Sequence, residues 1–193
     1  AQLGGQAFYS CRVADDELGA YYTLDLQTNG VATNLSHTAA QEGQTGSCMV
    51  LVTPDAERSM CTFLGATSQL DAKALHPQDI AKSKIYYMEG YLAASPTGLN
   101  AALKGRQIAK DTNVTLALTL SDVSMIQFCK AGLDAMLGDG VDYLFCNQEE
   151  AQVWCGTQDL EEVRSQLKKL AKMVCMTRGP EGSEVMTAEQ TWH

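Results

Sequence analysis

The segment VDYLFCNQEE, residues 141–150, decides the fold class of this chain. Its first six residues form an apolar run with the length of a buried strand, and Asn147 follows at once as a helix N-cap. The segments KIYYME (84–89), VTLALTL (114–120) and MVCMT (173–177) are further apolar runs, and helical patterns separate the four. Ser95 and Asp122 are expected to start two of these helices, and the last helix is expected over about residues 160–171. Apolar strands that alternate with helices predict an α/β domain, a mostly parallel sheet with helices on both faces.

The first third of the chain has a different texture. Residues 6–13 are typical of a strand, and Asp15 or Asp16 then caps a helix that stops at Gly30. Three short segments rich in Val, Thr, Met and aromatic residues follow, with turn signals between them, and they predict a small antiparallel sheet. These segments are residues 31–36, 47–53 and 58–64.

The composition excludes several classes of partner. The chain has 193 residues with 23 acidic and 14 basic side chains, a formal charge of −9, which argues against nucleic acid or an anionic membrane as the main partner. No apolar run approaches the roughly 18 to 20 residues of a membrane span. Seven cysteines, an odd number without a C-x-x-C pair, indicate reduced core thiols, no zinc site and a cytoplasmic location.

Ligands of such sheets bind beyond the carboxyl ends of the strands, which directs attention to residues 89–91, 147–150 and 177–182. Asn147 and Glu150 have the spacing of a capping box. The same carboxylate and amide, held at a helix N-terminus, could organise hydrated magnesium and phosphate oxygens. The two interpretations are compatible, because a cap can also be a ligand.

The segment TRGPEG (177–182) also has two interpretations. Its glycines would let backbone N–H groups approach an anion, and they would equally serve a hairpin turn into a strand over residues 183–187. Arg58 is either a solvated strand end or a phosphate clamp, and Tyr91 either packs or stacks on a ligand ring.

Together, the motifs along nearly the whole chain resemble the ribokinase-like (PfkB) carbohydrate and nucleoside kinases, and the adenosine-kinase-like branch in particular. The segments that carry this resemblance occur in the family's order. They are ADDELG (14–19), TG (45–46), PDAERSMCTFLGA (54–66), EGY (89–91), LTLS (118–121), NQEE (147–150) and TRGPEG (177–182).

The resemblance implies a ribokinase-like three-layer sandwich, with an α/β core over residues 1–30 and 65–193 and a small β lid over residues 31–64. It implies ATP-dependent transfer of the γ-phosphoryl group to a hydroxyl of a sugar or nucleoside, with magnesium, in a monomer or homodimer. Carried over residue by residue, the family pattern gives nucleotide-site, metal-site and acceptor-site candidates. They are Asn147, Thr177, Gly179, Gly182 and Arg58 for the nucleotide, Glu150 for magnesium, and Tyr91, Cys48, Met60 and Thr62 for the acceptor.

The family's G-A-G-D motif, whose Asp is the catalytic base, does not occur in the sequence. We expect it after His193, and the acceptor-binding Gly-Gly-Asn segment before Ala1, so that the chain as given is the middle of a kinase and is inactive alone. The alternative is a non-catalytic nucleotide- or sugar-binding relative that lacks the base.

Overall fold

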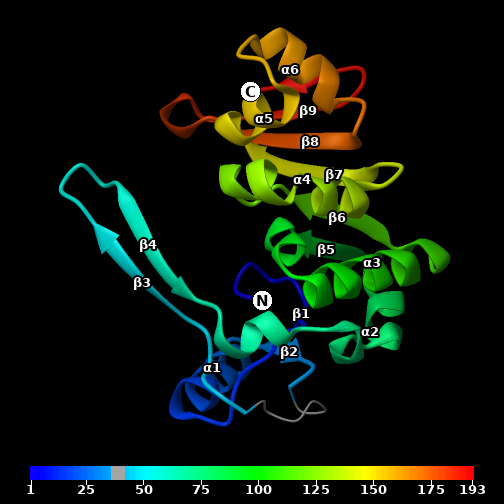
Figure 1. Ribbon diagram of the computed structural model, residues 1–193. Helices are drawn as coiled ribbons and strands as arrows, with labels where there is room; N and C mark the ends of the chain where they lie inside the picture. Colours follow the sequence, from blue (N-terminus) through cyan, green and yellow to red (C-terminus); the bar gives the residue numbers. More distant parts are fainter. Residues whose placement is uncertain (36–41) are drawn as a thin grey trace. The chain divides into compact units, whose positions relative to one another are not determined.

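The structure is a computed structural model that describes residues 1–35 and 42–193, in two compact units, Ala1–His76 and Pro77–His193 (Figure 1). The segment predicted as a strand up to Ser36 thus reaches beyond the described residues. The first unit contains the predicted lid together with residues that we expected in the core. The division into core and lid therefore stays a prediction.

The second unit is built on a six-stranded sheet in the order β10-β9-β8-β7-β6-β5. The four strands β5 to β8 are parallel and β9 and β10 are antiparallel to their neighbours, which confirms the prediction of a mostly parallel sheet. The strands are β5 (Ile85–Glu89), β6 (Thr115–Thr119), β7 (Val141–Asn147), β8 (Ala171–Thr177), β9 (Ser183–Met186) and β10 (Thr191–Trp192).

Helices connect the parallel strands, and polar side chains start them. Ser95, Asp122, Asn147 and Asp159 each accept a backbone hydrogen bond as N-caps. One expected boundary is wrong, because the last of these helices ends at Leu167 rather than at Ala171, which already belongs to β8. The helices are α2 (Pro77–Lys82), α3 (Pro96–Asp111), α4 (Val123–Leu137), α5 (Gln148–Cys155) and α6 (Leu160–Leu167).

One row of apolar side chains crosses five strands in register and forms the centre of this unit's core. Each of these side chains is at most 1% exposed. Helices α3 to α6 pack on this side of the sheet; Tyr86, two residues before the row on β5, lies against Gly105 of α3. On the other side Tyr87 and Phe145 meet edge to face and are 49% and 37% exposed. The row is Met88, Leu118, Leu144, Val174 and Met186.

The first unit begins with a strand–helix–strand segment: β1 (Ala7–Tyr9), α1 (Glu17–Thr28) and β2 (Val31–Thr33). The prediction that residues 31–36 join the small antiparallel sheet is wrong, because β2 pairs in parallel with β1. The strand expected over residues 6–13 is also shorter. Both differences have one cause: α1 returns the chain beside β1, and only three residues on each side form the ladder.

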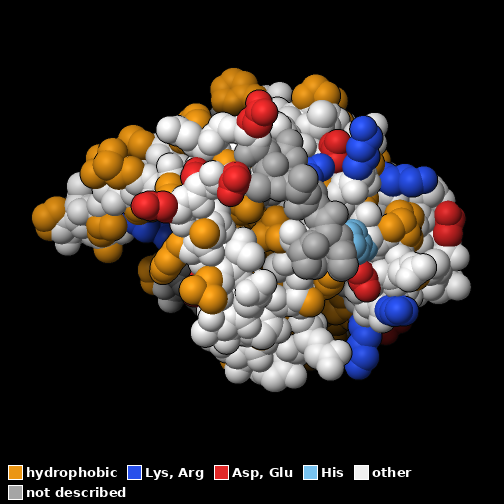
Figure 2. Space-filling model, turned by 90° about the horizontal axis from the view of Figure 1, so that it is seen from below, with side chains coloured by type: hydrophobic (Ala, Val, Ile, Leu, Met, Phe, Trp, Pro, Cys, Tyr) orange, Lys and Arg blue, Asp and Glu red, His pale blue; other side chains and the backbone are white. Residues whose placement is uncertain are grey.

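The antiparallel pair of β3 (Ser47–Val52) and β4 (Arg58–Phe63) is confirmed as a hairpin. All twelve strand residues are exposed, and Figure 2 shows hydrophobic side chains gathered on its surface at the left of the view. Asp16 connects the start of α1 to Thr45, which precedes the hairpin. Its carboxylate accepts a hydrogen bond from the Gly19 N–H at 2.8 Å. It also accepts hydrogen bonds from the N–H and the hydroxyl of Thr45, at 2.8 and 2.5 Å.

All seven cysteines are free thiols, but they are not all core residues as predicted. Cys11 and Cys146 are buried, whereas Cys48 and Cys61 are exposed because both lie on the hairpin. Among the described residues, no helix has the length and apolar character needed to cross a bilayer.

Candidate functional site

The pairing of β7 with β8 brings two of the predicted site segments together. Asn147 and Thr177 are register partners at the carboxyl ends of these neighbouring strands, and Ser183 of β9 is the next partner of Thr177. Asn147 and Thr177 are both exposed, so this edge of the sheet is open to solvent. The two motifs are 30 residues apart in the sequence and adjacent in the fold.

Asn147 and Glu150 form a complete capping box at the start of α5. The Glu150 N–H donates to Asn147 Oδ1 at 2.8 Å, and the Asn147 N–H donates to Glu150 Oε2 at 3.1 Å. The Asn147 side-chain amide also donates to Glu150 Oε1, at 2.7 Å. The structural interpretation of this motif is confirmed, and its two carboxylate oxygens keep further lone pairs for a ligand.

Glu150 is only 5% exposed, and this burial raises the pKa of its carboxyl group above the ordinary value. The hydrogen bond from the Asn147 backbone opposes the shift, and the charges of Asp122 and Glu149 add to it. Negative charge is thus concentrated at this point, which favours a cation beside the carboxylate.

Asp122, the N-cap of α4, extends the site to the neighbouring strand β6, because its charge acts on Glu150. Burial is the largest cause that raises the pKa of Tyr91, and the charges of Asp122 and Glu150 raise it further. Tyr91 is 54% exposed and donates a hydrogen bond to the Ser121 carbonyl at 3.3 Å. The signal available in the sequence was position: Asp122 follows a buried strand almost as directly as Asn147 does.

The backbone between Tyr91 and Asp122 is tightly packed. A Cβ atom on Gly90 would lie 2.7 Å from the Thr119 carbonyl oxygen and 2.9 Å from the Ser121 hydroxyl. Ser121 itself has a φ of 72°, which is unusual for a residue with a side chain. Its buried hydroxyl has no hydrogen-bond partner among the described residues.

The segment 177–182 is a hairpin turn, as the structural interpretation predicted. It connects β8 to β9 through a short 3-10 turn, Gly179–Glu181. The Arg178 N–H donates to the Gly182 carbonyl at 2.8 Å, and φ values of 55° and 89° explain the glycines at 179 and 182. No atom lies within 4 Å of a Cβ built on either glycine, so their backbone faces open space.

Arg178 and Glu184 are further residues that the sequence analysis did not single out. Arg178 Nε donates to Gln148 Oε1 at 2.9 Å, and its Nη1 donates to Glu184 Oε1 at 2.8 Å. Glu184 is 1% exposed and also receives two hydrogen bonds from Arg164, at 2.6 and 2.8 Å. A charged residue at an inward position of a strand was the signal in the sequence.

The predicted residues of the hairpin lie on one face of it. Thr62 is the register partner of Cys48, and Met60 and Arg58 follow at alternate positions of the same strand. The Cys48 thiol and the Thr62 hydroxyl are 3.4 Å apart. The hairpin belongs to the first unit, so the roles predicted for these four residues toward a ligand of the second unit stay predictions.

The residues at the sheet edge fit a magnesium–nucleotide complex. No group of three or more His, Cys, Asp or Glu side chains among the described residues could hold a metal ion unaided. Magnesium rarely needs such a cage, because it keeps waters and is bound by one or two carboxylates plus substrate phosphates. Glu150 would supply the carboxylate, while Thr177 and the open backbone at Gly179 and Gly182 would face the phosphates.

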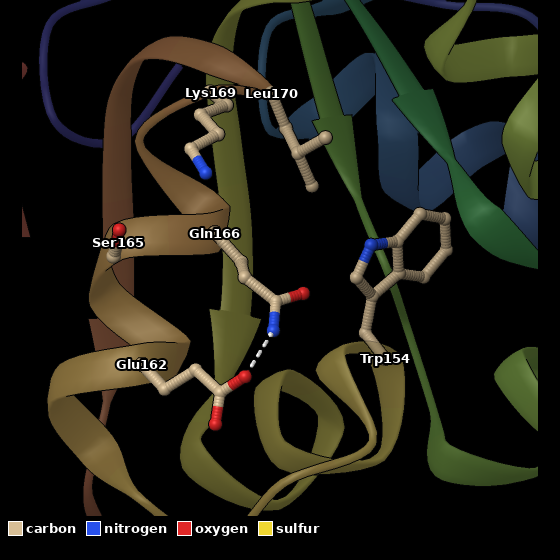
Figure 3. A pocket seen from close by; sticks show the side chains of 6 residues that line it. All are labelled: Trp154, Glu162, Ser165, Gln166, Lys169 and Leu170. Carbon is tan, nitrogen blue, oxygen red and sulfur yellow. Dashed lines mark hydrogen bonds between the residues drawn. The ribbon is translucent and has the colours of Figure 1, made fainter.

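Two hollows of the second unit lie elsewhere, toward the amino ends of the strands. One, of about 480 Å³, lies between α5 and α6 and is shown in Figure 3, where Trp154 faces Leu170 and Gln166 donates to Glu162. Lys130 lies 3.6 Å from the centre of a Trp154 ring. The second, of about 680 Å³, is lined by charged residues that form ion pairs, Lys110 with Asp139 and Lys172 with Asp142. Neither hollow contains a predicted site residue.

Comparison with known proteins gives a match over the whole chain. The family described as pfkB family carbohydrate kinase matches residues 1–193. Guanosine-inosine kinase of Escherichia coli K12 is 27% identical over 169 residues, which are 86% of this chain and 39% of that protein.

Solved structures show the same likeness. The adenosine kinase of Sinorhizobium meliloti has a TM-score of 0.93 at 32% identity, covering 99% of this chain and 58% of that one. A probable sugar kinase from Rhizobium etli CFN 42 has a TM-score of 0.92 at 31% identity, with the same coverages. These structures confirm the ribokinase-like α/β fold, and the chain spans about three fifths of their length.

Proposed function

This chain belongs to the pfkB family of carbohydrate kinases, and from that membership we propose that the protein transfers the γ-phosphoryl group of ATP to a hydroxyl of a sugar or nucleoside. One observation of the fold carries the proposal: the Asn147–Glu150 box and the Thr177–Gly182 turn meet at one sheet edge. A nucleoside is favoured as acceptor by two relatives, named guanosine-inosine kinase and adenosine kinase.

In the proposed reaction the acceptor oxygen bonds to phosphorus as the bond to ADP breaks. The acceptor hydroxyl passes its proton to a general base, the role that the resemblance gives to the Asp of the family's G-A-G-D motif. When bound, magnesium would neutralise phosphate charge. Glu150 would hold the ion, with Asn147 orienting the carboxylate through the three hydrogen bonds of the capping box. The Thr177 hydroxyl and the turn at Gly179 and Gly182 would place N–H and O–H donors beside phosphate oxygens.

The hairpin would supply the remaining contacts. Arg58 would pair with the transferred phosphate, and Cys48, Met60 and Thr62, which share its face, would contact the acceptor together with Tyr91. A lid of the kind that the resemblance implies would exclude water, which otherwise competes with the acceptor. The free thiols fit a reducing compartment, and we propose the cytosol.

The test measures phosphotransfer by the protein purified from its natural source, after its intact mass has been determined. ADP release is followed with Mg²⁺, ATP and a panel of purine nucleosides, ribose and related sugars. We expect release that depends on one acceptor class and falls about tenfold in Thr177→Val, while Thr187→Val, the same change in the turn that follows β9, stays near wild type. Nucleotide binding without acceptor-dependent release would overturn the kinase proposal in favour of a binding protein.

A further inference from the structure

We infer that Arg178 is a positioning residue that holds the Thr177–Gly182 turn at a fixed distance from the Asn147–Glu150 box, with buried Glu184 as its anchor. This inference rests on the proposed function for its purpose, because the two segments would bind one nucleotide. The structural part of the inference, that Arg178 connects the turn to α5 and β9, rests on its hydrogen bonds alone.

The guanidinium group of Arg178 reaches three separate parts of the fold. Its Nε donates to Gln148, the first residue of α5, at 2.9 Å, and its Nη1 donates to Glu184 on β9 at 2.8 Å. Its Nη2 donates to Glu181 within the turn itself. One planar group thus ties the turn to the helix that starts at Asn147 and to the strand that follows the turn.

Glu184 gives this connection its rigidity. The carboxylate is 1% exposed and receives Arg164 Nε on Oε2 at 2.8 Å and Arg164 Nη2 on Oε1 at 2.6 Å, beside Arg178. The charged hydrogen bonds from Arg164, then the charges of Arg164 and Arg178, lower the pKa of Glu184 and keep it ionised. An ionised, buried carboxylate shared by two guanidinium groups fixes the position of both.

The shape of the Arg178 side chain matters more than its charge. Three partners in three directions require a planar fork with several donors, whereas a lysine presents one flexible ammonium group. A lysine at 178 would keep the positive charge near the site and lose most of this geometry. A residue that only attracted phosphate would tolerate that exchange.

The experiment compares Arg178→Lys with Arg164→Lys, a matched change on the other side of Glu184 that leaves the turn's own contacts in place. Amide hydrogen exchange is measured without nucleotide, and the Kd for MgATP is measured by calorimetry. We expect Arg178→Lys to speed exchange of residues 177–182 and of the start of α5, and to raise the Kd, each by about tenfold. Arg164→Lys weakens the anchor at Glu184 but keeps the contacts of Arg178 with Gln148 and Glu181, so both changes should be clearly smaller there, about threefold at most.

Gln148→Ala gives the same test without altering a buried charge, and replaces Arg178→Lys if that variant fails to fold. Unchanged exchange in the turn, equal loosening in Arg164→Lys, or wild-type affinity in Arg178→Lys would each overturn the inference. If wild-type protein binds no MgATP, the proposed function fails, and the exchange data still decide the connection.

Discussion

Replacing Glu150 with Gln separates the two roles of the Asn147–Glu150 box. The wild-type carboxylate accepts two hydrogen bonds from Asn147, at 2.7 Å from the side-chain amide and at 3.1 Å from the backbone N–H. Gln keeps the shape and one acceptor oxygen, so one of the two bonds can persist. It removes the negative charge that magnesium would need.

The expected loss of stability is small. A hydrogen bond to a charged group contributes about 1.5–3 kcal/mol to stability, and Glu150→Gln loses one such bond. Part of this loss is offset, because Glu150→Gln no longer buries a charge at a site that is 5% exposed. A complete N-cap contributes about 0.5–2 kcal/mol. We expect the free energy of unfolding to fall by about 1 kcal/mol, which lowers the Tm by about 2–4 °C in a chain of this size.

The effect on stability should depend on pH. Burial raises the pKa of Glu150 in the folded chain, so its carboxyl group contributes most below its unfolded pKa and loses that contribution as pH rises through the folded pKa. The deficit of Glu150→Gln relative to wild type should therefore shrink as the pH rises from below the ordinary pKa of glutamate, about 4.3, toward neutral pH. Urea unfolding at several pH values measures it.

Magnesium dependence is the decisive assay. The Mg²⁺ concentration for half-maximal ATP binding should rise about tenfold in Glu150→Gln, as expected when one charged ligand is lost. Glu149→Gln is the matched control, because Glu149 lies in the same helical turn and is exposed. A stability loss well above about 2 kcal/mol with unchanged magnesium dependence would mean that Glu150 is a cap and nothing more.

Three further experiments test the packing of the fold and the exposure of the thiols. Leu144→Ala should lower the free energy of unfolding by about 2–5 kcal/mol in urea, because Leu144 is 1% exposed in the central row; a loss below about 1 kcal/mol would contradict that packing. Gly90→Ala should lower the free energy of unfolding by about 1–3 kcal/mol through overpacking, and the Tm by several degrees, because its Cβ would lie 2.7 Å from a carbonyl oxygen. Gly5→Ala, with open space around it, should leave the Tm unchanged. Iodoacetamide at pH 8 should label exposed Cys48 much faster than Cys11, whose pKa burial raises to about 11; mass spectrometry of the labelled peptides decides, and equal rates would refute the burial.

The sequence by itself determined the elements whose signals are local. The apolar runs of β5 to β8 and the caps Ser95, Asp122 and Asn147 were readable because a strand's burial and a helix's first turn depend on residues within a few positions. The capping box of Glu150 was predictable for the same reason: both partners lie within four residues.

Only the tertiary structure decided which distant residues meet. The sequence could not show that β2 pairs with β1 rather than with the hairpin, because three-residue ladders leave little pattern. Nor could it show that Arg178 reaches Gln148, 30 residues away, or which two guanidinium groups share the carboxylate of Glu184. Such contacts depend on strand order and register, in which a shift of one residue turns every side chain to the opposite face.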